Sequence, residues 1–415
     1  MDSILHISDF EDEGDYNPFE VDAVNFGDML DPYPQIHKWR EKGPVIRGGY
    51  RQMLGYEYPM LPETETFTVV GSAEIAEALA HPDIFSNKGF EPTVGATFGK
   101  TLTAMDNPEH RLYRQPFQKI FLPHHVKKWG ETIVDPIVHR LMEKFIHRGE
   151  ADLLAEFTIL YPFEVIYKQL NLPKEDIASF QRIAVAQTDW AHAEIAIEAG
   201  RRLGLYFKDL LDKRRADPGD DLITQLADTR LENGEPVPEE VLLSFLRQLM
   251  NAAGDTTYRG TSVLMVALLS NPEQLEAIRL DRSLINQAIE EALRWDGPVT
   301  AHLRMATRDT ELGGVKIPKG AFLDLVAGAA NRDPEVFENP DQFDIFRKRI
   351  PNFAFARGPH ICVGQHLARV EMTRALHAIL DNLHNLRLDP DKPKPEIRGA
   401  IMRVPHYIHV KFDPK

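Results

Sequence analysis

The sequence is poor in cysteine, with Cys362 as the only one among 415 residues. A single thiol cannot form an intramolecular disulfide bond, so its chemistry is that of a thiol, a thiolate or a metal ligand. Long apolar runs are also missing: none approaches the roughly 20 residues that a membrane-spanning helix needs. Positive charge is scarce as well, because 63 acidic residues face 48 basic ones. This balance argues against nucleic acid or an anionic membrane as the main partner.

Lys and Arg are missing altogether from the first 31 positions, which contain ten Asp or Glu. That composition is the opposite of a secretory signal or a transit peptide, and a lone cysteine suits a reducing compartment. We therefore expect a cytoplasmic protein in which residues 1–30 form an acidic arm. A solvated arm is the simpler interpretation, and a docking element is the alternative.

Helical spacing of apolar residues dominates the rest of the chain, which is 43% hydrophobic overall and can build a large core. Strand candidates are short β-branched runs between turn residues, at 43–46, 66–70, 315–317 and 321–326. Residues 86–104 are rich in Gly, Thr and Phe without a clear period. We expect a long loop there that exposes Phe90 and Phe98 as an adaptable apolar wall.

The longest helical pattern begins near residue 235 and ends at Ser270, before Asn271-Pro272. Such a helix is about 50 Å long, enough to cross the molecule. Its middle, residues 252–257, reads Ala-Ala-Gly-Asp-Thr-Thr. Gly, Asp and Thr are poor residues for a helix interior. The cluster therefore predicts a site where a ligand packs close to the backbone and needs an acid and an alcohol.

Cys362 lies in the pattern F-x-x-G-x-H-x-C-x-G, which spans residues 355–364 and precedes another helical run. Three further patterns accompany it. His110 and Arg114 share one face of an early helix and suit an anion, although a solvated polar face explains them too. Glu291 and Arg294 are spaced i, i+3 and could be only a surface ion pair. Residues 339–343 read Asn-Pro-Asp-Gln-Phe.

Together and in this order, these motifs resemble those of the cytochrome P450 family over nearly the whole chain, and most closely its soluble bacterial members. The resemblance implies a mainly α fold with a small β-rich lobe, built as a single domain over residues 31–415. It also implies that the long central helix lies over a haem b. A single iron-bound cysteine would then be a proximal thiolate ligand that favours cleavage of the O–O bond.

The family pattern implies a role for each motif residue around the haem. Cys362 would bind the iron, Phe355 would shield the sulfur, and Gly358 and Gly364 would let the backbone turn tightly. Backbone N–H groups before the next helix would stabilise the thiolate. The residues expected to pair with the haem propionates are His110, Arg114, Arg304 and His360.

On the opposite side of the haem, the resemblance implies that Asp255 and Thr256 deliver protons during oxygen activation. Gly254 and the two alanines before it would leave room for O2. Glu291 and Arg294 are expected to lock the segment before the cysteine loop and to take no part in catalysis. The residues expected to line the substrate site are Phe90, Phe98, Leu249, Ala252, Val299, His302 and Ile401. His302 is either a further propionate partner or a polar anchor for substrate.

The resulting hypothesis is a haem-thiolate monooxygenase that hydroxylates or otherwise oxidises a small, largely apolar substrate with O2. We expect it to be a monomer without an electron-transfer domain of its own, served by a ferredoxin-type protein and its reductase. Arg111, Arg114 and Arg357 could form the dock for an acidic partner. The alternatives are a peroxide-driven haem-thiolate enzyme, a non-catalytic haem-binding sensor and a cysteine-nucleophile enzyme without haem.

Overall fold

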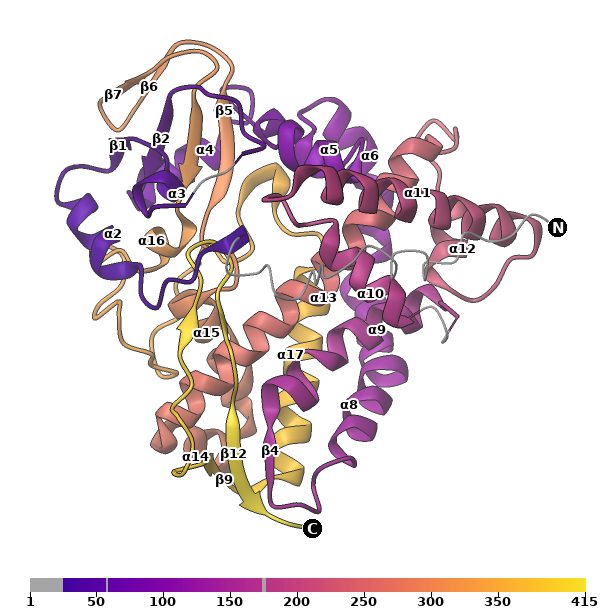
Figure 1. Cartoon of the computed structure of the whole chain (residues 1–415), viewed down its shortest axis with the longest axis vertical. Coiled ribbons are helices and arrows are strands. Elements are labelled where there is room, and N and C mark those ends of the chain that lie inside the picture. Colours follow the sequence, from indigo (N-terminus) through magenta and orange to yellow (C-terminus); the bar gives the residue numbers. More distant parts are fainter. Residues whose placement is uncertain (1–24, 57–58, 174–176) are drawn as a thin grey trace.

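Long helices form most of the molecule, and a mixed β-sheet with short helices forms a lobe at one side of them (Figure 1). This computed structural model describes residues 25–56, 59–173 and 177–415. The helices are α2 (Tyr33–Arg40), α3 (Tyr50–Met53), α4 (Ser72–Ala80), α5 (Ala96–Phe98), α6 (Glu109–Ile120), α7 (Pro123–Trp129), α8 (Asp135–Met142), α9 (Leu160–Leu170), α10 (Ile177–Ala186), α11 (Ala193–Ala216), α12 (Leu222–Ala227), α13 (Glu239–Ser270), α14 (Pro272–Leu280), α15 (Ile285–Asp296), α16 (Ala327–Asn331) and α17 (Gln365–Asn382). The mainly α fold predicted from the sequence is confirmed.

The strands are short and, within the described residues, belong to four separate sheets. They are β1 (Val45–Arg47), β2 (Thr66–Val69), β3 (Phe85–Ser86), β4 (Glu150–Asp152), β5 (His302–Ala306), β6 (Thr310–Leu312), β7 (Val315–Ile317), β8 (Phe322–Leu325), β9 (His384–Leu388), β10 (Ile397–Arg398), β11 (Val404–Pro405) and β12 (His409–Asp413). The lobe contains the five-stranded sheet, in the order β1-β2-β8-β5-β3. Its β2–β8 pair is parallel, and the other pairs are antiparallel.

The central helix α13 is embedded in two hydrophobic cores. Its first half, through Met250, packs with α6, α9, α10 and α11, while its second half, from Val263, packs with α8, α14, α15 and α17. Pro272 begins the next helix directly after it. The polar run 252–257 falls between these two buried halves. This placement explains how an otherwise apolar helix tolerates the run, since its middle borders cavities and only its ends fill the cores.

Residues 86–104 differ from the loop expected from the sequence. They form consecutive short helical turns that include α5, and Phe98 is buried. Hydrogen bonds hold the segment at two points. Asp106 accepts from the backbone N–H of Asn87 at 3.0 Å, and Gln248 of α13 bonds to the hydroxyls of Thr101 and Thr103. The lack of a sequence period thus reflects a series of short turns fixed by tertiary contacts.

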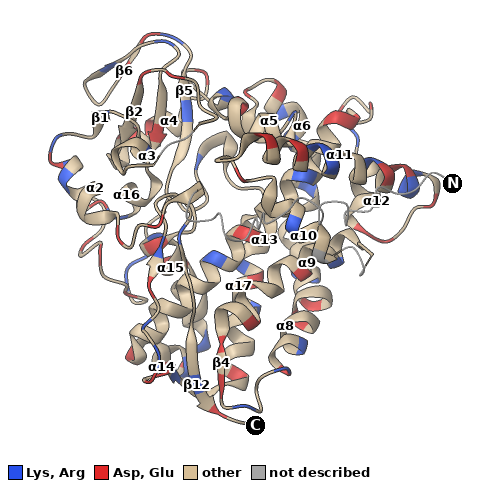
Figure 2. Ribbon diagram, in the orientation of Figure 1, with Lys and Arg blue, Asp and Glu red and all other residues tan. Residues whose placement is uncertain are grey.

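Only the end of the acidic N-terminal arm lies within the described residues. Phe26 is buried, and its carbonyl accepts from the N–H groups of Ala400 and Ile401. Residues 26–30 therefore pack onto the body of the protein, and the prediction for residues 1–24 lies outside the described part. Elsewhere acidic and basic side chains are interspersed along the helices (Figure 2). None of the helices in the described ranges is long and apolar enough to cross a bilayer.

Candidate active site

The cysteine loop contains two glycines, Gly358 and Gly364, and only Gly358 has a backbone conformation that requires glycine. Gly358 has a φ of +73°, and a Cβ there would lie 2.4 Å from the carbonyl oxygen of Leu79. Gly364 also lies in a turn, as predicted, but its φ of −84° is one that any residue adopts. A Cβ at Gly364 would lie 3.9 Å from Sγ of Cys362, which is an ordinary van der Waals contact. The loop is closed by the N–H of Cys362, which donates to Phe355 at 2.9 Å.

The sulfur of Cys362 faces an internal chamber, which accounts for its accessible surface. Burial raises the pKa of the Cys362 thiol above its usual value. Backbone N–H groups of Gly364 and Gln365, together with Arg114 and Arg369, act in the opposite direction. The N–H groups predicted to stabilise a thiolate are therefore present at the start of α17.

The cavity above the sulfur, which we call the cysteine chamber, has a volume of about 330 Å³. Its lining combines apolar side chains with basic and imidazole groups. Residues predicted from the sequence that line it are Phe90, His110, Arg114, Leu249, Ala252, Thr256, Val299, His302, Arg304, Phe355, His360 and Cys362. The fold thus brings together residues that lie more than 270 positions apart in the chain.

The basic and imidazole groups of the chamber fit an anionic cofactor. The rings of His110 and His360 stack with centroids 3.8 Å apart. His110 is 2% exposed, and neither of its nitrogens has a hydrogen-bond partner among the described residues. Burial lowers the pKa of His110 to about 4 and that of Arg304 to about 10. Desolvated donors without carboxylate bonds suit the two propionates of a haem.

One wall of the chamber is formed by α13. Ala252 and Thr256, four residues apart, share one face and line the chamber. The hydroxyl of Thr256 donates to the carbonyl of Ala252 at 2.9 Å. Gly254 is not among the residues that line either cavity, and a Cβ there would lie 2.4 Å from the ring of Phe163 on α9. The prediction that Gly254 makes room for O2 is therefore wrong, and it instead permits close packing of two helices.

Asp255 forms an ion pair that the sequence analysis missed. Nε of Arg259 donates to its two carboxylate oxygens at 3.0 and 3.1 Å. Arg259 is 2% exposed, and its guanidinium lies 5.5 Å from the ring centroid of Phe26. The i, i+4 spacing of the two residues in the middle of a helix was the signal that could have revealed the pair.

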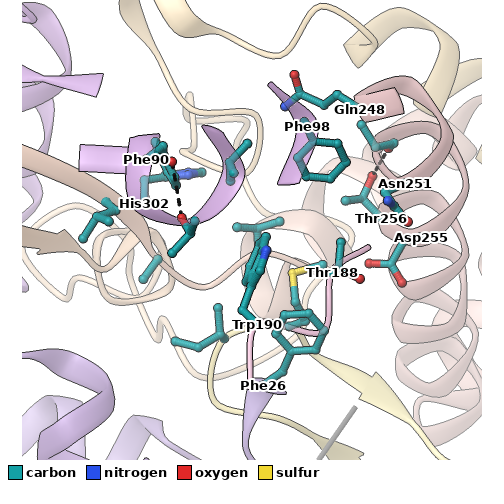
Figure 3. Close-up of a pocket in the computed structure, with 18 of the residues that line it drawn as sticks. Phe26, Phe90, Phe98, Thr188, Trp190, Gln248, Asn251, Asp255, Thr256 and His302 are labelled. Carbon is teal, nitrogen blue, oxygen red and sulfur yellow. Dashed lines mark hydrogen bonds between the residues drawn. The ribbon is translucent and has the colours of Figure 1, made fainter. Parts of the chain in front are cut away.

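A second cavity of about 280 Å³, which we call the distal pocket, adjoins the cysteine chamber (Figure 3). Both cavities share Phe90, Gln248, Ala252, Thr256, Val299 and His302. Among the residues predicted to contact substrate, Phe98 and Ile401 line only the distal pocket, and Leu249 lines only the chamber.

Several residues that line the distal pocket were not predicted. They include Phe26, Phe163, Gln248, Asn251 and Arg259. Spacing by one helical turn from Ala252 was the available signal for Gln248. Phe26 and Trp190 come from distant segments and meet edge to face at 6.3 Å, so no local pattern could have joined them.

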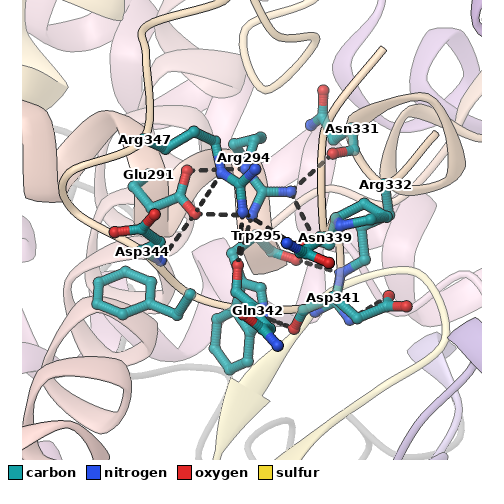
Figure 4. A network of polar contacts seen from close by, with 12 residues as sticks. Glu291, Arg294, Trp295, Asn331, Arg332, Asn339, Asp341, Gln342, Asp344 and Arg347 are labelled. Atoms are coloured by element: carbon teal, nitrogen blue, oxygen red, sulfur yellow. Dashed lines mark hydrogen bonds and ion pairs between the residues drawn. The ribbon is translucent and has the colours of Figure 1, made fainter. Parts of the chain in front are cut away.

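The pair Glu291 and Arg294 is buried beside the segment that precedes the cysteine loop (Figure 4). Arg294 contacts both carboxylate oxygens of Glu291, at 2.7 and 2.8 Å. It also donates to the carbonyls of Asn331, Pro340 and Gln342 at 2.8 to 3.0 Å. The predicted structural lock on this segment is confirmed, and the surface ion pair is excluded.

Comparison with known proteins gives a consistent result. The profile of the family described as "Cytochrome P450" matches residues 192–412. The cytochrome P450 monooxygenase PikC of Streptomyces venezuelae is 32% identical over 399 residues, which cover 92% of this chain and 92% of that protein. The vitamin D3 dihydroxylase of Streptomyces griseolus is 35% identical over 286 residues, or 68% of this chain and 70% of that protein.

Solved structures share the fold. CYP109E1 from Bacillus megaterium, in complex with testosterone, matches with a TM-score of 0.79 and 26% sequence identity. The match covers 92% of this chain and 99% of that one.

Proposed function

Because this chain belongs to the cytochrome P450 family, we propose that it hydroxylates or otherwise oxidises a small, largely apolar organic molecule, with electrons from a ferredoxin-type partner. Membership of the family, in its bacterial form, makes the protein a haem-thiolate oxidoreductase. The substrate, the type of oxidation and the electron donor are the parts that we add.

One observation carries the assignment of residues: the sulfur of Cys362 and the side chain of Thr256 line the same chamber, with imidazole and guanidinium groups around it. In our proposal Cys362 would supply the thiolate that binds the iron, and His110, Arg114, Arg304 and His360 would hold the propionates. Bound there, haem would activate O2 so that one oxygen atom enters a C–H bond and the other leaves as water, at the expense of two electrons and two protons.

Thr256 and Asp255 are proposed to handle those protons. The Thr256 hydroxyl borders both cavities, and the neighbouring carboxylate borders the distal pocket. A hydroxyl beside an acid can pass protons through water to a reacting group. The ion pair with Arg259 would hold the Asp255 carboxylate in place between proton transfers.

An apolar substrate is supported by the distal pocket and by the relatives. Aromatic side chains from distant parts of the chain line the pocket, including Phe98, Phe163 and Trp190. The related proteins are named for action on vitamin D3 or were solved with testosterone, both of which are mainly hydrocarbon. Burial of such a surface is the main favourable contribution to binding in a cavity of this kind.

The proposed dock for a ferredoxin is the surface around the cysteine loop. Arg111 is exposed there, Arg114 contacts the carbonyl of Ile361, and the Arg357 guanidinium lies 3.9 Å from the ring centroid of Phe353. These cations would meet an acidic partner close to the iron ligand. The cytoplasmic location and the monomeric state remain predictions from the sequence.

The experiment that tests the proposal is the absorption spectrum of the reduced protein with CO. A thiolate ligand gives the strongly red-shifted Soret band that is typical of the family, and Cys362→His should replace it with the band of an imidazole-ligated haem. Turnover with a ferredoxin, its reductase and NAD(P)H should then exceed turnover with peroxide alone. A red-shifted band that persists in Cys362→His would refute the ligand assignment, and faster turnover with peroxide would favour the peroxide-driven alternative.

A further inference from the structure

Asn251 is a buried polar residue in the wall of the distal pocket. It precedes Asp255 by one turn of α13 and lines the pocket (Figure 3). The residue is buried, and Nδ2 has no hydrogen-bond partner within the described ranges. Because the two ends of an amide are interchangeable by rotation, this side chain can present a donor or an acceptor to a ligand. A buried amide is costly unless something bonds to it.

His302 presents a comparable group from the other side. It begins β5 and lines both cavities, and its Nε2 is buried without a partner in the described part of the chain. Burial and the nearby Arg304 lower the pKa of His302 to about 4, so the imidazole is neutral near neutral pH. Two neutral side chains that can form hydrogen bonds thus line the same cavity.

The charged side chains that line the pocket occur as opposite-sign neighbours. Asp255 is bonded to Arg259, and Arg51 acts electrostatically on Asp324 to lower its pKa against the larger, raising effect of burial. A carboxylate ligand that entered this pocket would have to compete with Asp255 or Asp324 for its cation. Burial of a charge without its own partner is strongly unfavourable.

We propose that Asn251 is a specificity-determining residue and that the substrate is a neutral, mainly apolar molecule with a hydroxyl or carbonyl oxygen that bonds to it. The inference rests on the proposed function and narrows its substrate class. Free fatty acids and plain hydrocarbons are excluded as preferred substrates. His302 offers a second hydrogen bond to a molecule that carries oxygens at both ends of the pocket.

The helix geometry also fixes where the oxygen lies relative to the reacting carbon. Asn251 and Thr256 are five residues apart, so they are separated by about 7.5 Å along the helix axis. The reacting carbon must lie beside Thr256, where the two cavities join. The anchoring oxygen is therefore several bonds away from the carbon that is oxidised.

The test compares ligands that share a skeleton and differ in one group. One set is adamantane, 1-adamantanol and 1-adamantanecarboxylate, and another is dodecane, 1-dodecanol and dodecanoate. Dissociation constants are measured on the haem-loaded protein from the spectral shift that accompanies loss of iron-bound water and, independently, by equilibrium dialysis. We expect the alcohol of at least one set to bind about three- to tenfold more tightly than its hydrocarbon and its carboxylate.

Variants assign the preference to one side chain. Asn251→Leu should abolish the preference for the alcohol while the hydrocarbon still binds. If this variant folds poorly, the smaller substitution Asn251→Ala tests the same expectation. Thr93→Val is the matched control, because Thr93 also lines the pocket but its hydroxyl lies 3.4 Å from the carbonyl oxygen of Phe90. It should keep the preference.

Three outcomes would overturn the inference: tightest binding of a carboxylate, an alcohol preference that survives both Asn251 variants, or no binding of any alcohol. If Asn251 had a purely structural role, its substitution would raise the dissociation constants of all ligands alike and leave the ratios between them unchanged. The CO spectrum of each sample keeps this test separate from the proposed function, since a normal band shows that the haem-thiolate site is intact whatever the ligands do.

Discussion

Glu371 offers a quantitative test of how the core around α13 is built. It lies on α17 and is 1% exposed, and its Oε2 has no hydrogen-bond partner in the described part of the chain. Burial raises its pKa well above the ordinary value of 4.5. The ionisable neighbour is Tyr161 of α9, whose hydroxyl lies 2.6 Å from that of Thr261. Burial thus favours the neutral carboxylic acid of Glu371 over its carboxylate.

The magnitude follows from proton linkage. Below pH 4.5 the folded and unfolded chains both hold the proton, so Glu371 lowers stability only above that pH. As the pH rises, the unfolded chain releases the proton and the folded chain keeps it, which costs about 1.4 kcal/mol per pH unit. At pH 7, which is 2.5 units above the ordinary pKa, the upper limit of this loss is about 3.4 kcal/mol. Glu371→Gln keeps the shape and cannot ionise, so it should escape this loss.

The assay is urea unfolding of the haem-loaded protein, followed by tryptophan fluorescence at several values between pH 5 and pH 7.5. The stability of Glu371→Gln relative to the natural protein should rise with pH along the calculated slope. Glu143→Gln, at an exposed position, is the control and should give a flat difference. The infrared band of a protonated carboxyl group should also disappear in Glu371→Gln. A flat difference for Glu371→Gln would refute the reasoning, because the carboxyl would then ionise equally in both states.

Three further predictions concern the active site and its support. Thr256→Val should keep haem binding but lower the product formed per electron by about tenfold or more. The control Thr188→Val should leave this yield unchanged, because the Thr188 hydroxyl already bonds to the carbonyl of Val185. An equal product yield per electron in the two variants would contradict the proton role of Thr256. Arg111→Glu should raise the dissociation constant of an acidic ferredoxin, most clearly at low salt, and an unchanged constant would move the dock elsewhere. Arg294→Met should lower the free energy of unfolding by about 3 to 5 kcal/mol, because Glu291 loses its bidentate partner and three carbonyls lose their donor. A change below about 1 kcal/mol would contradict the structural role of Arg294.

The features that could be predicted from the sequence are those that depend on residues close together in the chain. The central helix, its polar middle and the cysteine loop were all identified because composition and spacing within a few residues distinguish them. The fold confirms that His110 and Cys362 line one chamber, although they are 252 positions apart. Family resemblance supplied that juxtaposition, since no local pattern contains it.

The errors arose where tertiary contacts decide the outcome. Gly254 was placed toward O2, but the helical phase directs it toward Phe163. Residues 86–104 were expected to form a loop because nothing local orders them, whereas Asp106 and Gln248 hold them in short turns. The position of Asn251 in a cavity wall could not be predicted from the sequence, because nothing distinguishes this asparagine from one on an exposed helix face until the surrounding elements are known.

Strand β5 has a consequence for anyone who wishes to redesign this protein. His302 and Arg304 are two residues apart, so their side chains leave the strand on the same side, one toward both cavities and the other into the cysteine chamber. Pairing with β8 fixes this register. An inserted or deleted residue in β5 would turn both side chains away from the cavities. Any change in substrate selectivity would then come with a loss of contacts to the cofactor. Directed evolution of this strand should therefore use substitutions alone.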